Sequence, residues 1–175
     1  MTAAARAPAP AAGREEPRER TRPRRLALVA SKGTLDGAYP PLILAATAAS
    51  LGWEVGIFFT FYGLDIVHRR RHRKLKVAPV GNPAMPVPVP NLLGALPGMT
   101  AAATTMMKGW MKRARLPDVA QFLEMARESG TKLFACSTTM GVMGVKESDL
   151  LPGVDIAGAT AFLDFAAGAD VSLFV

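Results

Sequence analysis

The segment TKLFACSTT, residues 131–139, passes directly from an apolar run into a cluster of hydroxyl side chains. Residues 131–136 have the length and composition of a buried parallel strand. Hydroxyl groups such as those at residues 137–139 often cap helices, so a helix is expected to begin there. In open α/β sheets, ligands bind at the carboxyl ends of the strands, beside the N-termini of helices. Cys136 is therefore expected at the edge of a sheet where a site would form.

Strands and helices alternate outward from this segment in both directions. Apolar runs rich in β-branched and aromatic residues predict further strands at residues 26–31, 54–60, 154–157 and 171–175. Helical spacing and turn residues predict helices at residues 35–51, 64–71, 117–129, 139–145 and 160–167. Such alternation implies a parallel sheet with right-handed crossovers. The sequence therefore predicts one α/β domain over residues 26–175, with a flavodoxin-like, doubly wound sheet of five parallel strands.

The loops after the first two predicted strands should share a sheet edge with Cys136, because the carboxyl ends of parallel strands meet at one edge. These loops carry Ser31, Lys32 and Gly33 after the first strand and Tyr62 after the second. Lys32 at that edge would stabilise a thiolate or an anionic sulfur substrate, although a lone loop lysine is more often only solvated.

Cys136 is the only cysteine of the chain. Nearby helix N–H groups would favour its thiolate, which is the nucleophilic form. A free cysteine is about as often a small buried hydrophobe, and the local sequence does not decide between the two interpretations. A single cysteine excludes an internal disulfide framework and a multi-cysteine zinc site.

The two histidines, His68 and His72, are spaced i, i+4, which on a helix would allow them to bind one metal ion. They lie, however, in the strongly basic run HRRRHRKLK, residues 68–76. Surrounding cations repel a metal ion, so a solvated basic face is expected here. The sequence predicts neither a metal site nor a cofactor.

The first 25 residues differ in composition from the rest of the chain. They contain seven arginines and three glutamates among alanine and proline, which predicts a disordered basic tail. No apolar segment of suitable length marks the tail as a secretory signal. Residues 26–175 carry 14 basic and 11 acidic residues, a small excess that gives little support to nucleic-acid binding.

An insert at residues 77–115 separates the second and third crossover units. Its first part, residues 77–107, has no charged residue and contains six prolines, which argues against a membrane-spanning helix. Residues 38–63 are also apolar but read as a buried helix and strand. The methionines of the insert are expected to pack against other residues and not to bind copper. We expect the insert to mediate self-association, with peripheral contact to a membrane surface as the alternative.

Four segments resemble the DsrE/DsrF-like superfamily, in particular its branch labelled peroxiredoxin-like. They are LVASKGTLD at residues 28–36, FFTFYGL at 58–64, GNPAMP at 81–86 and, above all, ACSTTMGVMG at 135–144. The resemblance extends over residues 26–175. It implies a cytoplasmic, homo-oligomeric protein that carries sulfur as a persulfide or thiosulfonate on Cys136. It also implies TusA-like sulfur carriers or rhodaneses as exchange partners.

By this resemblance, Ser137, Thr138, Thr139 and the backbone N–H groups of the following helix would stabilise the anionic sulfur. The single cysteine offers no internal resolving thiol, which argues against a two-cysteine peroxidase despite the label of the branch. The alternative is a non-catalytic oligomeric scaffold or regulatory subunit in which Cys136 is buried and structural.

Overall fold

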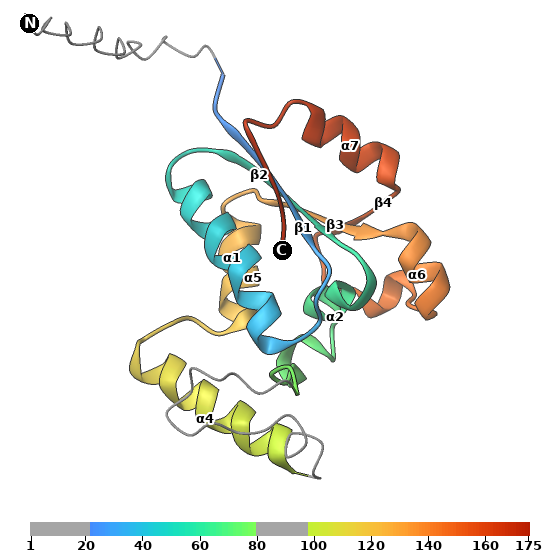
Figure 1. Ribbon diagram of the computed structural model, residues 1–175. Coiled ribbons are helices and arrows are strands. Elements are labelled where there is room, and N and C mark those ends of the chain that lie inside the picture. Colours follow the sequence, from blue (N-terminus) through green and yellow to red (C-terminus); the bar gives the residue numbers. More distant parts are fainter. Residues whose placement is uncertain (1–21, 80–97) are drawn as a thin grey trace, which may run out of the picture.

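The computed structural model describes residues 22–79 and 98–175, which contain one sheet of five parallel strands (Figure 1). The strands are β1 (Arg25–Ala30), β2 (Glu54–Phe59), β3 (Lys132–Cys136), β4 (Val154–Ala157) and β5 (Val171–Phe174). Their order across the sheet is β4-β3-β2-β1-β5, and every neighbouring pair is parallel. The predicted α/β fold with a five-stranded parallel sheet is confirmed.

The strand order differs from that of flavodoxin, so this detail of the prediction is wrong. In flavodoxin β1 lies between β2 and β3, whereas here it lies between β2 and β5. The chain steps from β1 to β4 in one direction and then returns to the other side of β1. Because crossovers are right-handed, the connection from β4 back to β5 places its helix on the opposite face of the sheet from the helices of the earlier connections.

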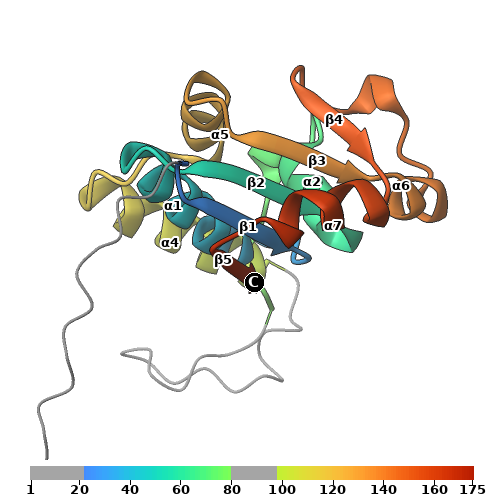
Figure 2. The ribbon, with the colours of Figure 1, turned by 90° about the horizontal axis from the view of Figure 1, so that it is seen from above.

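Helices cover both faces of the sheet (Figures 1 and 2). They are α1 (Leu35–Ser50), α2 (Leu64–Val67), α4 (Met99–Arg113), α5 (Val119–Glu128), α6 (Ser137–Met143) and α7 (Ala159–Ala167). Short 3-10 turns lie at Phe61–Gly63, His72–Lys74 and Glu147–Asp149. Helices α1 and α5 pack on one face, and α7 packs on the other.

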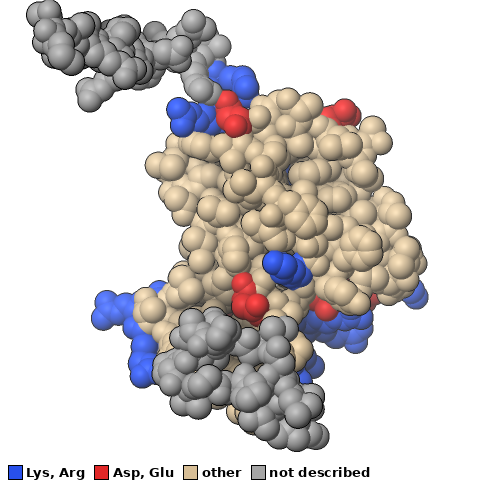
Figure 3. All heavy atoms as spheres, in the orientation of Figure 1, with Lys and Arg blue, Asp and Glu red and all other residues tan. Residues whose placement is uncertain are grey.

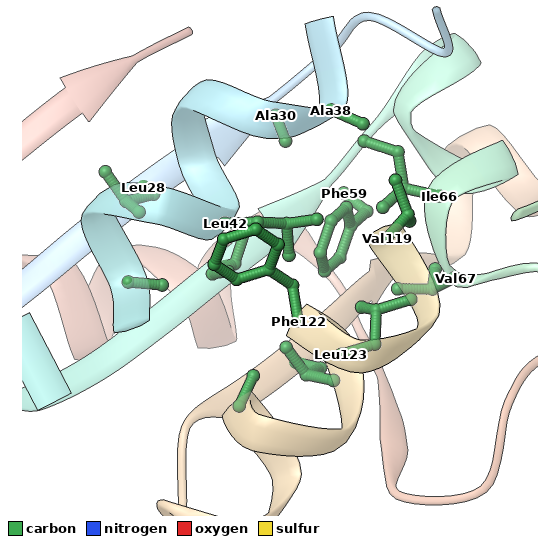
Figure 4. Packing of buried hydrophobic residues seen from close by; sticks show 14 of the residues in the cluster. Leu28, Ala30, Ala38, Leu42, Phe59, Ile66, Val67, Val119, Phe122 and Leu123 are labelled. Atoms are coloured by element: carbon green, nitrogen blue, oxygen red, sulfur yellow. The ribbon is translucent and has the colours of Figure 1, made fainter. Parts of the chain in front are cut away.

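Two clusters of buried side chains result, because successive residues of a strand point to opposite faces. The larger cluster joins the α1 and α5 face to residues such as Leu28 and Phe59 (Figure 4). The smaller cluster consists of Ala27, Phe58, Cys136, Phe162 and Phe165. Cys136 therefore lies under α7 and not under α1 or α5.

The insert contains a helix that the sequence analysis did not predict. Helix α4 runs over residues 99–113, and its Thr104 accepts a hydrogen bond from the N–H of Val77 at 3.1 Å. Residues 80–97 lie outside the described part of the chain, so the role of the insert in self-association stays a prediction. Within the described segments, no helix combines the length and apolar character needed to cross a membrane.

The predicted helix at residues 64–71 ends early, and its histidines are not solvated. Helix α2 stops at Val67, and His68 forms an isolated antiparallel bridge with Leu150. His68 and His72 are both buried, which corrects the expectation of a solvated face. Nδ1 of His68 accepts a hydrogen bond from the N–H of Arg70, and Nδ1 of His72 lies 2.9 Å from the carbonyl oxygen of His68. The two histidines and Leu75 are buried, whereas all six cations of this run face solvent.

The folded domain begins before residue 26. Arg25 is the first residue of β1, and its side chain binds Glu54 at 2.7 Å and donates to the carbonyl oxygen of Phe165 at 3.0 Å. The guanidinium of Arg24 lies 5.4 Å from the ring of Trp53. Arg24 and Arg25, which were assigned to the tail, therefore belong to the folded domain. Residues 1–21 lie outside the described part of the chain.

Candidate functional site

Cys136 is the last residue of β3, at the carboxyl edge of the sheet as predicted. It pairs with Ala157 of β4 and packs in the smaller buried cluster. Only 7% of the residue is exposed. The thiol thus lies just below the surface, between the sheet and α7.

Cys136 also occupies the N-cap position of α6, which begins at Ser137. The hydroxyl groups of residues 137–139 were expected to cap this helix, but they form its first turn and the cysteine precedes them. No side-chain hydrogen bond caps the helix. The N–H groups of Thr138 and Thr139, which are the usual donors to an N-cap side chain, instead act on the sulfur.

A second threonine, Thr60, approaches the sulfur from the neighbouring strand. Its hydroxyl lies 3.0 Å from that of Thr139, and the N–H of Phe61 lies 3.4 Å from the same Thr139 oxygen. The side chain of Thr139 is buried. The two hydroxyls therefore form a polar pair beside the apolar cluster that contains Cys136.

These groups make the Cys136 thiol more acidic than usual. Burial on its own raises the pKa of Cys136, but the hydroxyls of Thr139 and Thr60 and the N–H groups of Thr139 and Thr138 together lower it. Hydrogen-bond donors stabilise the thiolate more than the neutral thiol. The site thus favours a nucleophilic sulfur anion.

The loops after β1 and β2 meet at this edge. The N–H of Gly63 donates to the carbonyl oxygen of Ser31 at 3.1 Å. A Cβ atom at Gly33 would lie 2.2 Å from the carbonyl oxygen of Tyr62, so only glycine permits this approach. The prediction that these two loops share an edge with Cys136 is confirmed.

The predicted site residues differ in their relation to the sulfur. Thr138 and Thr139 act on it directly, whereas Lys32, which is exposed, and Ser137 are not among the groups that change its pKa. Tyr62 is exposed at the rim of the site. The sequence analysis missed Thr60. The signal for it was its position directly after β2, because that strand is adjacent to β3.

The arrangement suits attack by sulfur on an electrophilic sulfur atom. A thiolate with stabilising donors and no second thiol can accept a sulfur atom and later lose it to another thiol. Among residues 22–79 and 98–175, no group of three or more histidine, cysteine or carboxylate side chains is placed to bind a metal ion.

Comparison with known proteins identifies a family and two similar proteins. The pattern of the DsrE/DsrF/DrsH-like family matches residues 22–174. The sulfur carrier protein DsrE2 of Allochromatium vinosum is 42% identical over 158 residues, which cover 87% of this chain and 98% of that protein. The uncharacterized protein YrkE of Bacillus subtilis is 32% identical over 162 residues, which cover 87% of this chain and 97% of YrkE.

The fold has a counterpart among solved structures. The crystal structure of the ychN protein from E. coli superposes with a TM-score of 0.56, at 13% sequence identity. The match covers 87% of this chain and 99% of the ychN chain. At this identity, the similarity extends to the fold alone.

Proposed function

Because the chain belongs to the DsrE/DsrF/DrsH-like family, we propose that it is a sulfur carrier that holds sulfane sulfur or thiosulfonate on Cys136. The observation that carries this proposal is the position of the only cysteine, at the carboxyl edge of the sheet and at the N-cap of α6, where neighbouring donors lower its pKa. The 42% identity to a protein named as a sulfur carrier supports the same conclusion.

The proposed reaction is a thiol–disulfide type of exchange. The Cys136 thiolate attacks the terminal sulfur of a donor persulfide, R–S–SH. The donor S–S bond breaks, a new S–S bond forms, and the donor leaves as the thiolate R–S⁻. With tetrathionate, the same attack leaves a thiosulfonate group on the cysteine and releases thiosulfate. Transfer to an acceptor thiolate reverses the persulfide step.

Delivery requires a thiol from another protein, because the chain has a single cysteine. We propose cytoplasmic partners of the TusA-like or rhodanese type, in line with the family resemblance. The exposed side chain of Tyr62 and its neighbour Phe61 lie at the rim of the site, where such a partner would approach. The backbone of Phe61 has a positive φ of 46°, which holds this aromatic residue in a conformation that side chains rarely adopt.

We further propose that the protein is a homo-oligomer, because apolar side chains remain exposed along the β5 edge of the sheet. Phe174 of β5 is 73% exposed, and Leu163 of α7 is 63% exposed. Figure 3 shows few charged side chains on the surface over β5 and between α1 and α7. An exposed strand edge with apolar side chains is typical of a subunit interface.

The low exposure of Cys136 favours a second candidate function, that of a scaffold or regulatory subunit with a structural cysteine. The two functions differ in what the thiol does in the folded protein. A carrier has to react with sulfane sulfur, whereas a scaffold does not.

Intact-mass analysis of the folded protein after incubation with polysulfide or tetrathionate tests the proposal. We expect added sulfur or thiosulfonate mass on the wild-type protein and none on Cys136→Ser. Unmodified wild-type protein, together with rapid modification after denaturation, would show that the thiol is structural.

A further inference from the structure

Two adjoining hollows form one groove beside α5. Their volumes are about 670 and 960 Å³, and both are lined by His72, Arg73, Ala120 and Glu124. The groove runs from the loop after α2, past the turn at His72–Lys74, to the carboxyl end of α4. It borders the larger buried cluster, whereas Cys136 belongs to the smaller cluster on the other face of the sheet.

From this groove we infer a docking site for an acidic, amphipathic segment of a partner protein. The inference does not depend on sulfur transfer, because no residue of the groove belongs to the thiol site. A partner docked there would leave the face with Cys136 free.

The main support is positive charge that the rest of the described chain does not neutralise. Six cations line the groove without a carboxylate in ion-pair distance among residues 22–79 and 98–175, namely Arg69, Arg73, Lys74, Lys108, Lys112 and Arg115. All six are exposed. We call this set the groove cations.

The carboxylates that line the groove are already engaged. The side chain of Asp118 caps α5 by accepting the N–H of Gln121 at 2.8 Å. Glu124 forms an ion pair with Arg127. Neither is paired with a groove cation.

Arg115 occupies a backbone position that suits glycine. It directly follows the last turn of α4 and its C-cap, Ala114, and has a φ of 55°. Helices commonly end with glycine in this left-handed conformation, because a side chain strains the backbone there. The strain is unrelated to burial, since Arg115 is exposed.

The chemistry of the lining favours a protein segment over a nucleic acid or a lipid surface. Half-buried Met111, Leu116 and Leu151 contribute apolar surface between the cations, which matches apolar side chains among carboxylates. Tyr39 offers no ring for a base to stack on, because it is buried and packs edge-on against Phe122. A hollow surface also fits an inserted segment better than a flat membrane.

This chain cannot supply the acidic segment itself. Residues 80–97 contain no charged residue, and residues 1–21 hold four arginines against three glutamates. A second copy would bring a net charge of +7. Charge complementarity therefore points to a different, acidic protein.

The test measures binding of the full-length protein to a labelled acidic amphipathic helix of about 18 residues, built from glutamate, leucine and alanine. We expect affinity that falls with added salt and drops at least about tenfold in the double variant Lys112→Glu, Arg115→Glu. The matched control is Arg113→Glu, which changes an exposed cation of the same helix outside the groove and should bind like wild type.

Arg115→Gly separates docking from folding. We expect weaker peptide binding together with an unchanged or higher melting temperature, because glycine relieves the backbone strain. The inference is overturned if Arg113→Glu weakens binding as much as the double variant Lys112→Glu, Arg115→Glu does, or if the acidic helix does not bind. It is also overturned if a single-stranded oligonucleotide of equal charge, or vesicles containing phosphatidylglycerol, bind more tightly than the helix and depend on the same residues.

Discussion

Four donors lower the pKa of Cys136, three of them from α6 and the fourth from Thr60, directly after β2. The N–H groups of Thr138 and Thr139 follow it in sequence, but the hydroxyl of Thr60 reaches it from the adjacent strand. These donors more than offset the burial that raises the pKa of the thiol. The acidity of the sulfur thus depends on the helical turn that residues 137–139 form and on the strand pairing that brings Thr60 close.

Removing the Thr139 hydroxyl should raise the pKa of Cys136. We expect Thr139→Val to alkylate with iodoacetamide roughly two- to tenfold more slowly than wild type at pH 7, because fewer thiolates are present. Thr139→Ser keeps the hydroxyl and serves as the control. Alkylation profiles against pH give the midpoints, and equal midpoints for Thr139→Val and wild type would contradict the role of the hydroxyl.

The same shift affects stability. Since the pKa of Cys136 is lower in the folded than in the unfolded chain, ionisation stabilises the fold. This contribution is fully present above the unfolded pKa, about 8.5, and is lost as the pH falls through the folded pKa. Denaturant unfolding should show that the difference in stability between wild type and Cys136→Ser grows with pH across this window. A pH-independent difference would argue against a lowered pKa.

At the scale of elements, polar contacts of Arg25 add to the apolar packing that holds the first strand. The Arg25 side chain connects Glu54 of β2 to Phe165 of α7, and its backbone N–H donates to Asp170 at 2.8 Å. Lys132 of β3 also binds Glu54, at 2.9 Å. The amino end of the sheet is therefore joined by a polar network across three neighbouring strands.

Two truncations should separate the tail from this network. Deletion of residues 1–21 should leave the melting temperature nearly unchanged, as the sequence composition predicts. Deletion of residues 1–25 removes several hydrogen bonds and the ion pairs of Arg22 with Asp170 and of Arg25 with Glu54, which we expect to cost about 1–3 kcal/mol. Thermal unfolding measures both, and equal melting temperatures for the two truncations would show that the Arg25 contacts contribute nothing.

At the scale of the whole molecule, the two faces of the sheet differ in how well they are covered. Helices α1 and α5 bury a large cluster on one face, whereas within residues 22–79 and 98–175 α7 is the one helix that covers the smaller cluster on the other. The edge strand β5 leaves Phe174 exposed beside it. A second subunit would complete the cover, and the sulfur site lies on this same less protected face.

A charge placed at Phe174 should therefore dissociate the proposed oligomer. Phe174→Asp removes an exposed side chain, so the fold of the single chain should tolerate it, while burial of an unpaired carboxylate in an interface is costly. Val142→Asp is the control, because Val142 is equally exposed but lies on α6, away from β5. Light scattering gives the mass of each variant. An unchanged mass for Phe174→Asp would place the interface elsewhere.

The order of strands and helices follows from local sequence. Residues such as Gly52, Thr34 and Pro117 mark turns and helix starts. The apolar runs between such residues predicted the ends of the strands to within one or two residues. Helix α4 was not predicted from the sequence, because its first nine residues carry no charge and follow a proline-rich segment. No charged face therefore marks a helical period there. The candidate cysteine was also found locally, from a strand end that precedes a helix.

Long-range pairing decided what local sequence could not show. Thr60 and Thr139 are 79 positions apart and meet only because β2 and β3 are neighbours in register. The placement of β5 beside β1 and the burial of His68 and His72 likewise depend on contacts between distant segments. Local propensity depends on neighbours within a few residues, whereas strand order and the surroundings of a side chain depend on which apolar faces pack together in space.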